Sequence, residues 1–205
     1  MIYHLTLRPS NRDWNFASVT MGGVPVEPTG GSGVARRARR SSDLFFWPGH
    51  SRLDYLTNSF ESRFELDKKT FRSVAWYMWY RRAKLWRPTT DLSVLVLEAK
   101  TQEEAKQLSR RCTDASSSLM RNWNDVRLRI MAEALVRKFQ SSVELASRLL
   151  QTGEDRLLYA SRYDAYYGIG FTMHEAADRS DEWGHNYLGQ MLMIVRKRLQ
   201  EGSIK

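Results

Sequence analysis

The chain has 205 residues, of which 42% are hydrophobic, 27% charged and 12% aromatic; this is enough to build a core and argues against wholesale disorder. It is strongly basic, since 32 Lys and Arg against 23 Asp and Glu give a net charge of +9 and a pI near 9.8. Its apolar runs are shorter than the ~20 residues of a membrane helix, and its N-terminus lacks the order of basic and apolar residues typical of a signal peptide.

Cysteine and histidine are sparse. Cys112 is the only cysteine, so neither a disulfide framework within the chain nor a cysteine-built zinc site is expected. The four histidines are scattered without the spacing of metal ligands. We therefore expect an intracellular, cytoplasmic protein with no metal and no cofactor.

Residues 1–43 are interpreted as an N-terminal extension. Residues 2–8 predict a short strand, and residues 21–42, rich in Gly, Pro and Ser, predict a loop. This loop contains four closely spaced arginines, Arg36, Arg37, Arg39 and Arg40. Such a run is able to bind the phosphates of a nucleic acid, and the alternative is an ordinary solvated basic loop.

From residue 44 the chain becomes densely patterned. Leu44 starts a buried segment that continues through Leu56, and residues 64–69 predict the tip of a hairpin. A helix is predicted from about Phe71 to Trp86, with bulky apolar residues at every position from 76 to 80. A helix that is apolar all round is buried, lines a pocket or meets a partner, and burial is the default expectation.

The middle of the chain predicts one strand and three helices. Residues 92–97 are apolar and branched, which favours a strand. A capping box at 101–104 opens a helix that runs to about Arg111. A second helix is predicted at 124–139. A third is predicted to begin after a Ser142 cap and to end at Gly153.

The C-terminal part predicts a strand, a glycine-containing loop and a last helix. The strand covers 157–160, and the helix begins near Asn186 and ends at Gly202. The expected fold is therefore mainly α with a few short strands (α+β), in a single domain over residues 44–205.

Several short motifs follow one another in the second half of the chain. They are Arg121-Asn-Trp123, Leu149-Leu150-Gln-Thr152-Gly153, Asp164-Ala-Tyr-Tyr167-Gly168-Ile-Gly170 and Gly184-His-Asn186-Tyr-Leu188-Gly189. Upstream stand Leu56-Thr57-Asn58-Ser59-Phe60 and Phe64-Glu-Leu-Asp67. In this order, over about residues 44 to 200, the motifs resemble the NADAR (YbiA-like) family of N-glycosidases. The Asn-x-Leu-Gly block is the most specific of them.

The resemblance implies cleavage of the C–N glycosidic bond of a ribosyl nucleotide, such as an ADP-ribosylated guanine or an intermediate of riboflavin synthesis. This chemistry needs a carboxylate beside the anomeric carbon, aromatic faces for the base and donors for phosphate. Carried over motif by motif, the resemblance makes Asp164 and Trp123 catalytic. It assigns the following residues to substrate binding: Asn58, Arg121, Tyr167, Gly168, Gly170, Asn186 and Gly189.

Three positions depart from the family pattern. Ala75 stands where the Val-Glu-His-Tyr motif has its catalytic glutamate, Tyr159 where a second acid is expected, and Tyr167 where the loop has tryptophan. A general acid or base contributes ~10²–10⁴-fold in rate, so these changes predict loss of hydrolysis unless another carboxylate takes over. Glu61 and Glu65 are the candidates for that replacement.

The retained residues also have structural interpretations. Asp164 is able to shape its loop, and Asn186 to cap the last helix. Gly189 lowers helix propensity by ~1 kcal/mol relative to Ala, so close packing is the expected reason for it. Trp123 is more often a core residue than a stacking one.

Three functional hypotheses follow. In the first, the chain keeps the family fold, has lost N-glycosidase activity and serves as a binding or structural module, in a viral or cellular assembly with nucleic acid or neighbouring subunits. In the second, it is an active N-glycosidase that uses Asp164 and a displaced glutamate. In the third, it senses an ADP-ribose-like nucleotide without turnover. The basic surplus extends through the main domain and favours an extended acidic partner, hence the first hypothesis.

Overall fold

The structure is a computed structural model that describes residues 42–50, 52–85, 91–111 and 117–204, with the backbone alone at 117–122. The strand predicted at 2–8, almost all of the loop at 21–42 and the arginines at 36–40 lie outside the described residues. No helix within the described part of the chain is long and apolar enough to cross a lipid bilayer.

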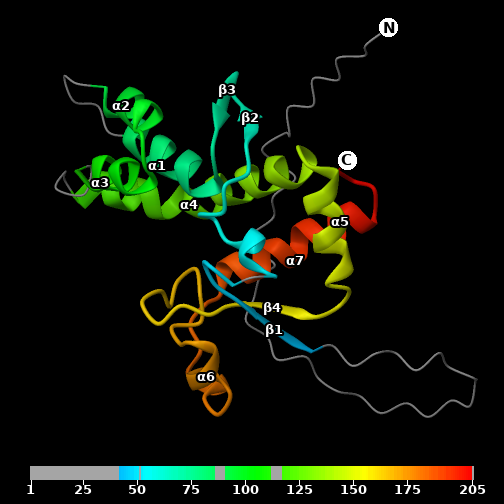
Figure 1. The fold of residues 1–205 in the computed structure, drawn as a ribbon. Coiled ribbons are helices and arrows are strands. Elements are labelled where there is room, and N and C mark those ends of the chain that lie inside the picture. Colours follow the sequence, from blue (N-terminus) through cyan, green and yellow to red (C-terminus); the bar gives the residue numbers. More distant parts are fainter. Residues whose placement is uncertain (1–41, 51, 86–90, 112–116, 205) are drawn as a thin grey trace, which may run out of the picture. The chain divides into compact units, whose positions relative to one another are not determined.

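The domain is mainly helical, with four short strands among the described residues, so the predicted fold class is confirmed (Figure 1). The first half contains β1 (Asp43–Phe46), a 3₁₀ turn (Asp54–Leu56), β2 (Phe64–Leu66), β3 (Lys69–Phe71), α1 (Val74–Leu85), α2 (Leu92–Glu98) and α3 (Gln102–Arg110). The second half contains α4 (Ser117–Gln140), α5 (Val143–Gln151), β4 (Arg156–Tyr159), α6 (Met173–Ala176), a 3₁₀ turn (Ser180–Glu182) and α7 (Tyr187–Gln200).

The strands form two separate pairs. β1 runs parallel to β4, with Phe46 opposite Tyr159, and α7 packs against β4. β2 and β3 form an antiparallel hairpin whose turn residues, Asp67 and Lys68, both have positive φ angles, of 52° and 61°. The expected hairpin tip and the strand expected at 157–160 are therefore confirmed.

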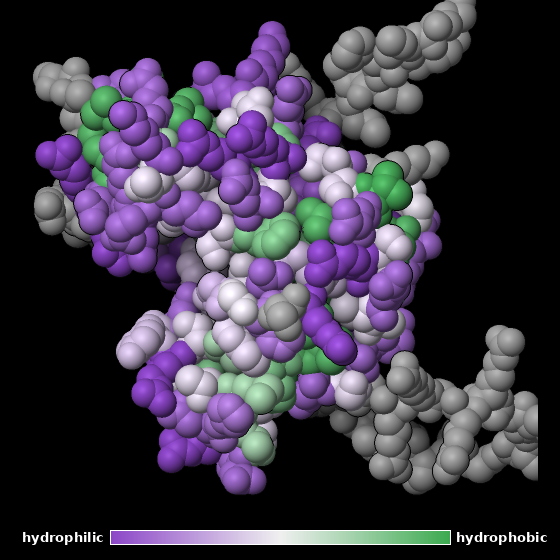
Figure 2. Space-filling view, in the orientation of Figure 1, coloured by the Kyte–Doolittle hydropathy of each residue, from purple (hydrophilic) through white to green (hydrophobic). Residues whose placement is uncertain are grey.

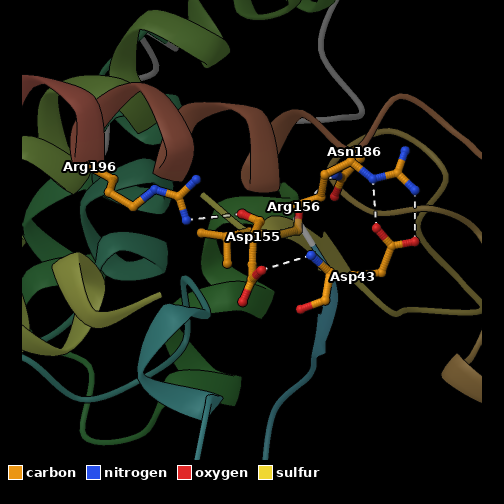
Figure 3. Close-up of polar contacts among 7 residues, drawn as sticks. Asp43, Asp155, Arg156, Asn186 and Arg196 are labelled. Carbon is orange, nitrogen blue, oxygen red and sulfur yellow. Dashed lines mark hydrogen bonds and ion pairs between the residues drawn. The ribbon is translucent and has the colours of Figure 1, made fainter. Parts of the chain in front are cut away.

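Polar contacts hold the start of the β1–β4 pair together (Figure 3). The Nε and Nη2 atoms of Arg156 donate to the two carboxylate oxygens of Asp43 at 2.6 and 2.7 Å. The backbone N–H of Ser42 donates to Asp155 Oδ1 at 2.7 Å. Because these residues are largely exposed, the contacts set the strand register more than they add stability.

A buried arginine on α7 joins that helix to the turn between α5 and β4. Arg196 is 5% exposed, and its Nη1 donates to Thr152 Oγ1 at 2.7 Å. The same atom donates to the Asp155 carbonyl at 3.0 Å (Figure 3). A guanidinium satisfies several acceptors at once, so one side chain fixes the end of α5 against α7.

The long helix α4 is central to the packing. It contacts α1, α5, α7 and the β2 strand, and it buries Ile130, Met131, Leu135 and Phe139 almost completely. It begins at Ser117, earlier than the predicted Asn124. The aromatic helix expected at 71–86 is α1, whose residues 76, 77, 78 and 80 are buried, so burial, the default expectation, is confirmed.

The strand predicted at 92–97 is wrong, because these residues form helix α2. Asp91 caps that helix, its Oδ1 accepting the backbone N–H of Ser93 at 3.0 Å. Leu92 and Val96 are buried, whereas Val94 is 42% exposed. Apolar residues four apart thus face the core, and this packing outweighs the modest strand preference of branched side chains.

The other predicted helix ends are largely confirmed. Thr101 Oγ1 accepts the N–H of Glu104 at 3.1 Å at the start of α3, but the Glu104 carboxylate bonds to the N–H of Lys100, so the capping box is only half formed. Ser142 caps α5 through the N–H of Leu145. Gly153 follows α5 with a φ of 58°, as a C-terminal stop requires.

Candidate functional site

The loop that follows β4 is shaped by Asp164. Its Oδ1 accepts two backbone N–H groups, from Tyr166 at 3.1 Å and from Tyr167 at 2.7 Å. Its backbone carbonyl accepts the N–H of Gly170 at 3.2 Å. A carboxylate that accepts the amides two and three residues further on makes a tight turn, so the loop-shaping interpretation of Asp164 has a direct geometric basis.

Backbone geometry explains why this loop has glycine at positions 168 and 170. At Gly168 a Cβ would lie 2.6 Å from the Tyr159 carbonyl oxygen, closer than any real side chain comes. That carbonyl accepts the N–H of Ile169 at 3.0 Å, so the loop lies directly against β4. Gly170 has a φ of 78°, which side-chain-bearing residues avoid. Both glycines hold the loop in place.

Asn186 does not cap α7, so that alternative is wrong. It has a φ of 50°, and its side chain makes no capping hydrogen bond. Instead its Oδ1 accepts the N–H of Tyr159 at 3.0 Å, and its Nδ2 donates to the Leu157 carbonyl at 2.9 Å. The buried amide therefore extends the edge of β4 as a neighbouring strand would, and it lies between α7 and β4 in Figure 3.

Gly189 has the close-packing role expected for it. A Cβ there would lie 2.0 Å from the Leu157 carbonyl oxygen and 2.5 Å from the Asn186 side chain. The first turn of α7 is thus in backbone contact with β4, and only a glycine leaves room for the bridging amide. Asn186 and Gly189 together join α7 to β4.

One face of α4 points to this loop. Trp123, Arg127 and Met131 follow one another at i, i+4 and i+8, so they share a face of the helix. The Arg127 guanidinium carbon lies 3.4 Å from the ring centroid of Tyr166, and the guanidinium is also hydrogen-bonded to the side chain of Tyr167. Burial raises the pKa of Tyr167 far above its usual value, although the Arg127 charge opposes the shift.

Trp123 is only 8% exposed, and the Arg82 guanidinium lies 5.9 Å from its ring. This burial fits a core residue at the edge of the site.

In Figure 2 the surface is largely hydrophilic, and its outline is indented between the part that carries α1 to α4 and the part that carries α6. The loop after β4 belongs to the second part (Figure 1).

Asn58 connects the start of α1 to α4. Its carbonyl accepts the N–H of Ala75 at 2.8 Å. Its Nδ2 has only thioether partners, Met131 Sδ at 3.4 Å and Met78 Sδ at 3.9 Å, and its Oδ1 is buried without any partner. Sulfur is a weak acceptor, so this part-buried side-chain amide is poorly satisfied.

The positions expected to hold acids are neutral. Ala75 is 9% exposed. Tyr159 is half-buried, its ring stacks on Phe46 at 5.5 Å, and its pKa is raised first by burial and then by the charge of Asp164. The replacement candidates Glu61 and Glu65 are both exposed, as solvent-facing residues would be.

Glu65 lines a groove of about 410 Å³ elsewhere, between the β2–β3 hairpin and the C-terminal end of α4. The other residues that line it are Arg63, Phe64, Thr70, Arg137, Gln140 and Ser141, and none of them belongs to the expected site. Within the described residues no three of His, Cys, Asp and Glu are grouped as metal ligands.

The structure thus brings Asn58, the loop from Asp164 to Gly170, and the Trp123 face of α4 to one region. Arg121 lies on α4 but outside the described side chains, and the arginines at 36–40 are outside the described chain. The sequence interpretation missed Arg127 and Tyr166. The spacing of Arg127, four residues after Trp123, was the available signal.

Comparison with known proteins gives consistent results. A model of the NADAR domain matches residues 45–200. An N-glycosidase of Nostoc punctiforme is 32% identical over 123 residues, which are 59% of this chain and 71% of that protein. The N-glycosidase YbiA of Escherichia coli is 33% identical over 109 residues, 50% of this chain and 62% of YbiA.

A riboflavin biosynthesis protein of Vibrio vulnificus is 35% identical over 106 residues, 52% of this chain but only 26% of that protein. Among solved structures, the NMR structure of E. coli YbiA resembles this one with a TM-score of 0.63 at 23% identity, covering 80% of this chain and 89% of that chain. This likeness shows a shared fold.

Proposed function

This chain belongs to the NADAR domain family, and from that premise we propose that it is a binding module for an ADP-ribose-like nucleotide that does not cleave the glycosidic bond. The proposal combines two features of one region. The polar and aromatic groups of a nucleotide site are present, whereas the carboxylate needed for hydrolysis is replaced.

The neutral surroundings of Ala75 carry the proposal. Asn58 is a backbone neighbour of Ala75, because its carbonyl accepts the Ala75 N–H; its side-chain amide faces two thioethers, and its Oδ1 has no partner. A glutamate at position 75 would offer this amide an acceptor, so the poorly satisfied amide is what loss of an acid would leave behind. Asp164, the acid that remains, already accepts two backbone amides with Oδ1.

The proposal that the site binds a nucleotide rests on Arg127, Tyr166 and Tyr167. The guanidinium of Arg127 lies beside the two aromatic rings of the loop after β4. Cations and aromatic faces are the groups that bind phosphates and bases. Relatives named N-glycosidases act on N-glycosides by their names, so a ligand of that class is the first to test.

The test measures turnover and binding separately. Purified protein is incubated with ADP-ribosylated guanine nucleotide, the products are resolved by mass, and E. coli YbiA serves as a reference. We expect a rate at least about 100-fold below that of a competent enzyme, because the principal acid is missing. We also expect measurable heat when ADP-ribose is titrated in by calorimetry. Turnover at the reference rate that Asp164→Asn abolishes would overturn the proposal, as would the absence of any binding heat.

A substitution at Ala75 tests the reason for the loss. Ala75→Glu is expected to raise turnover by about 10-fold or more, since it restores a carboxylate next to the Asn58 amide. Ala75→Gln is the matched control, because it has nearly the same volume without the charge. Equal rates for the two variants, with both folded by circular dichroism, would show that the missing acid is not what silences the site.

A further inference from the structure

Arg127 holds an unusual position for an arginine. Its Nε is buried and has no hydrogen-bond partner, one of only three such side-chain atoms among the described residues. Within that part of the chain it also forms no ion pair. A buried donor without an acceptor is destabilising, so it calls for an explanation in terms of what this side chain binds.

The guanidinium is held in one plane by its aromatic neighbours. The Tyr166 ring centroid lies 3.4 Å from the guanidinium carbon, and the Tyr167 ring centroid lies 5.9 Å from it. Tyr166 is itself packed against Tyr187, with ring centroids 4.8 Å apart. Stacking of this kind occupies the face of the guanidinium and leaves its N–H edge as the part that recognises a ligand.

A second unpartnered atom lies in the same region. Asn58 Oδ1 is buried without a partner, and its amide contacts Met131, which is one turn from Arg127 on the same face of α4. Two of the three unsatisfied atoms thus belong to side chains on either side of Met131. One offers an acceptor and the other a charged donor, which together match a ligand with an anionic part and a hydrogen-bonding part.

We propose that Arg127 is the anion receptor of this site and binds a phosphate group of the nucleotide. This inference rests on the proposed function and adds to it the group that the phosphate contacts. An oxygen anion at the guanidinium edge would supply the missing acceptor for Nε, in the geometry that favours arginine over lysine. The Tyr167 hydroxyl, which already bonds to Arg127, would hold the side chain in this orientation.

The experiment compares affinities of the full chain and its variants by calorimetry, with ADP-ribose and with adenosine, which has no phosphate. For Arg127→Lys we expect about 10- to 100-fold weaker binding of ADP-ribose, since the charge is kept but the planar edge is lost. Adenosine is expected to bind equally weakly to both proteins. Arg129→Lys is the matched control, because Arg129 points away on the opposite side of α4, and we expect no change there.

A second variant guards against a folding defect at Arg127. Tyr167→Phe keeps the ring and removes only the hydroxyl that positions the guanidinium, and we expect several-fold weaker ADP-ribose binding with adenosine unaffected. Wild-type binding with no effect of Arg127→Lys in a folded variant overturns this inference alone. No binding by the wild type overturns the proposed function as well. Binding of a single-stranded oligonucleotide but not of ADP-ribose would assign the phosphate to a nucleic acid and contradict the inference.

Discussion

Replacing Gly189 by alanine is expected to lower the free energy of unfolding by about 3 kcal/mol or more. The new Cβ would lie 2.0 Å from the Leu157 carbonyl oxygen, which is backbone and unable to rotate away. α7 must therefore move off β4, which also breaks the two hydrogen bonds of the Asn186 amide. Helix propensity alone predicts the opposite sign, a gain of about 1 kcal/mol.

Thermal and denaturant unfolding measure this difference. For a chain of this size, about 3 kcal/mol corresponds to a fall in Tm of roughly 6 to 12 °C. Gly153→Ala is the control, because a Cβ at that position meets nothing within 4 Å and only its φ of 58° is unfavourable, which costs about 1–2 kcal/mol. An unchanged or higher Tm for Gly189→Ala would mean that α7 does not contact β4 as described.

The stability of the domain is expected to rise with pH above neutrality because of Lys138. This side chain is fully buried, and its Nζ donates to the Thr57 carbonyl at 2.9 Å. Burial lowers the pKa of Lys138 from 10.5 to about 7, while the charge of Asp54 opposes the shift. The native state therefore pays a desolvation penalty whenever this amine is protonated.

The direction follows from the proton count of the two states. Below about pH 7 the amine is protonated in both the folded and the unfolded chain, so it adds no pH dependence. Between about pH 7 and pH 10.5 the unfolded chain binds a proton that the native state lacks. The free energy of unfolding then rises by at most about 1.4 kcal/mol per pH unit from this group within this window.

Urea unfolding at several pH values between 6 and 10 tests this expectation. Lys138→Met keeps the length of the side chain and removes the titrating amine, so the slope above pH 7 should fall by the contribution of one proton. Lys69→Met, at an exposed position on β3, should leave the slope as it is in the wild type. A wild-type slope that persists in Lys138→Met would contradict the assignment to this amine.

The sequence predicted only part of the candidate site. The order of short motifs indicated the family and drew attention to Asn58, Asp164 and Asn186, all of which lie where helix, strand and loop meet. Their contacts could not be read in the same way, because each joins segments far apart in the chain. The amide of Asn186 bonds to backbone 27 and 29 residues away, and that of Asn58 reaches a methionine 73 residues on.

The positive charge of the chain is not concentrated in one site. In the described domain several arginines are engaged within the fold, as Arg196 is at the end of α5 and Arg156 with Asp43. Arginine suits such positions because its fork satisfies several acceptors. These two arginines therefore serve the fold, whereas Arg127 is the arginine proposed to bind a ligand.

The sequence by itself determined the features that depend on neighbouring residues. Apolar periodicity and the Ser142 cap predicted α5, and the turn residues 67 and 68 predicted the hairpin, because these signals act within a few residues. Tertiary structure decided the rest. It made 92–97 a helix by burying one side of it, left the Nε atom of Arg127 without an acceptor, and enclosed the amine of Lys138. Burial and its electrostatic consequences arise only when distant segments pack together.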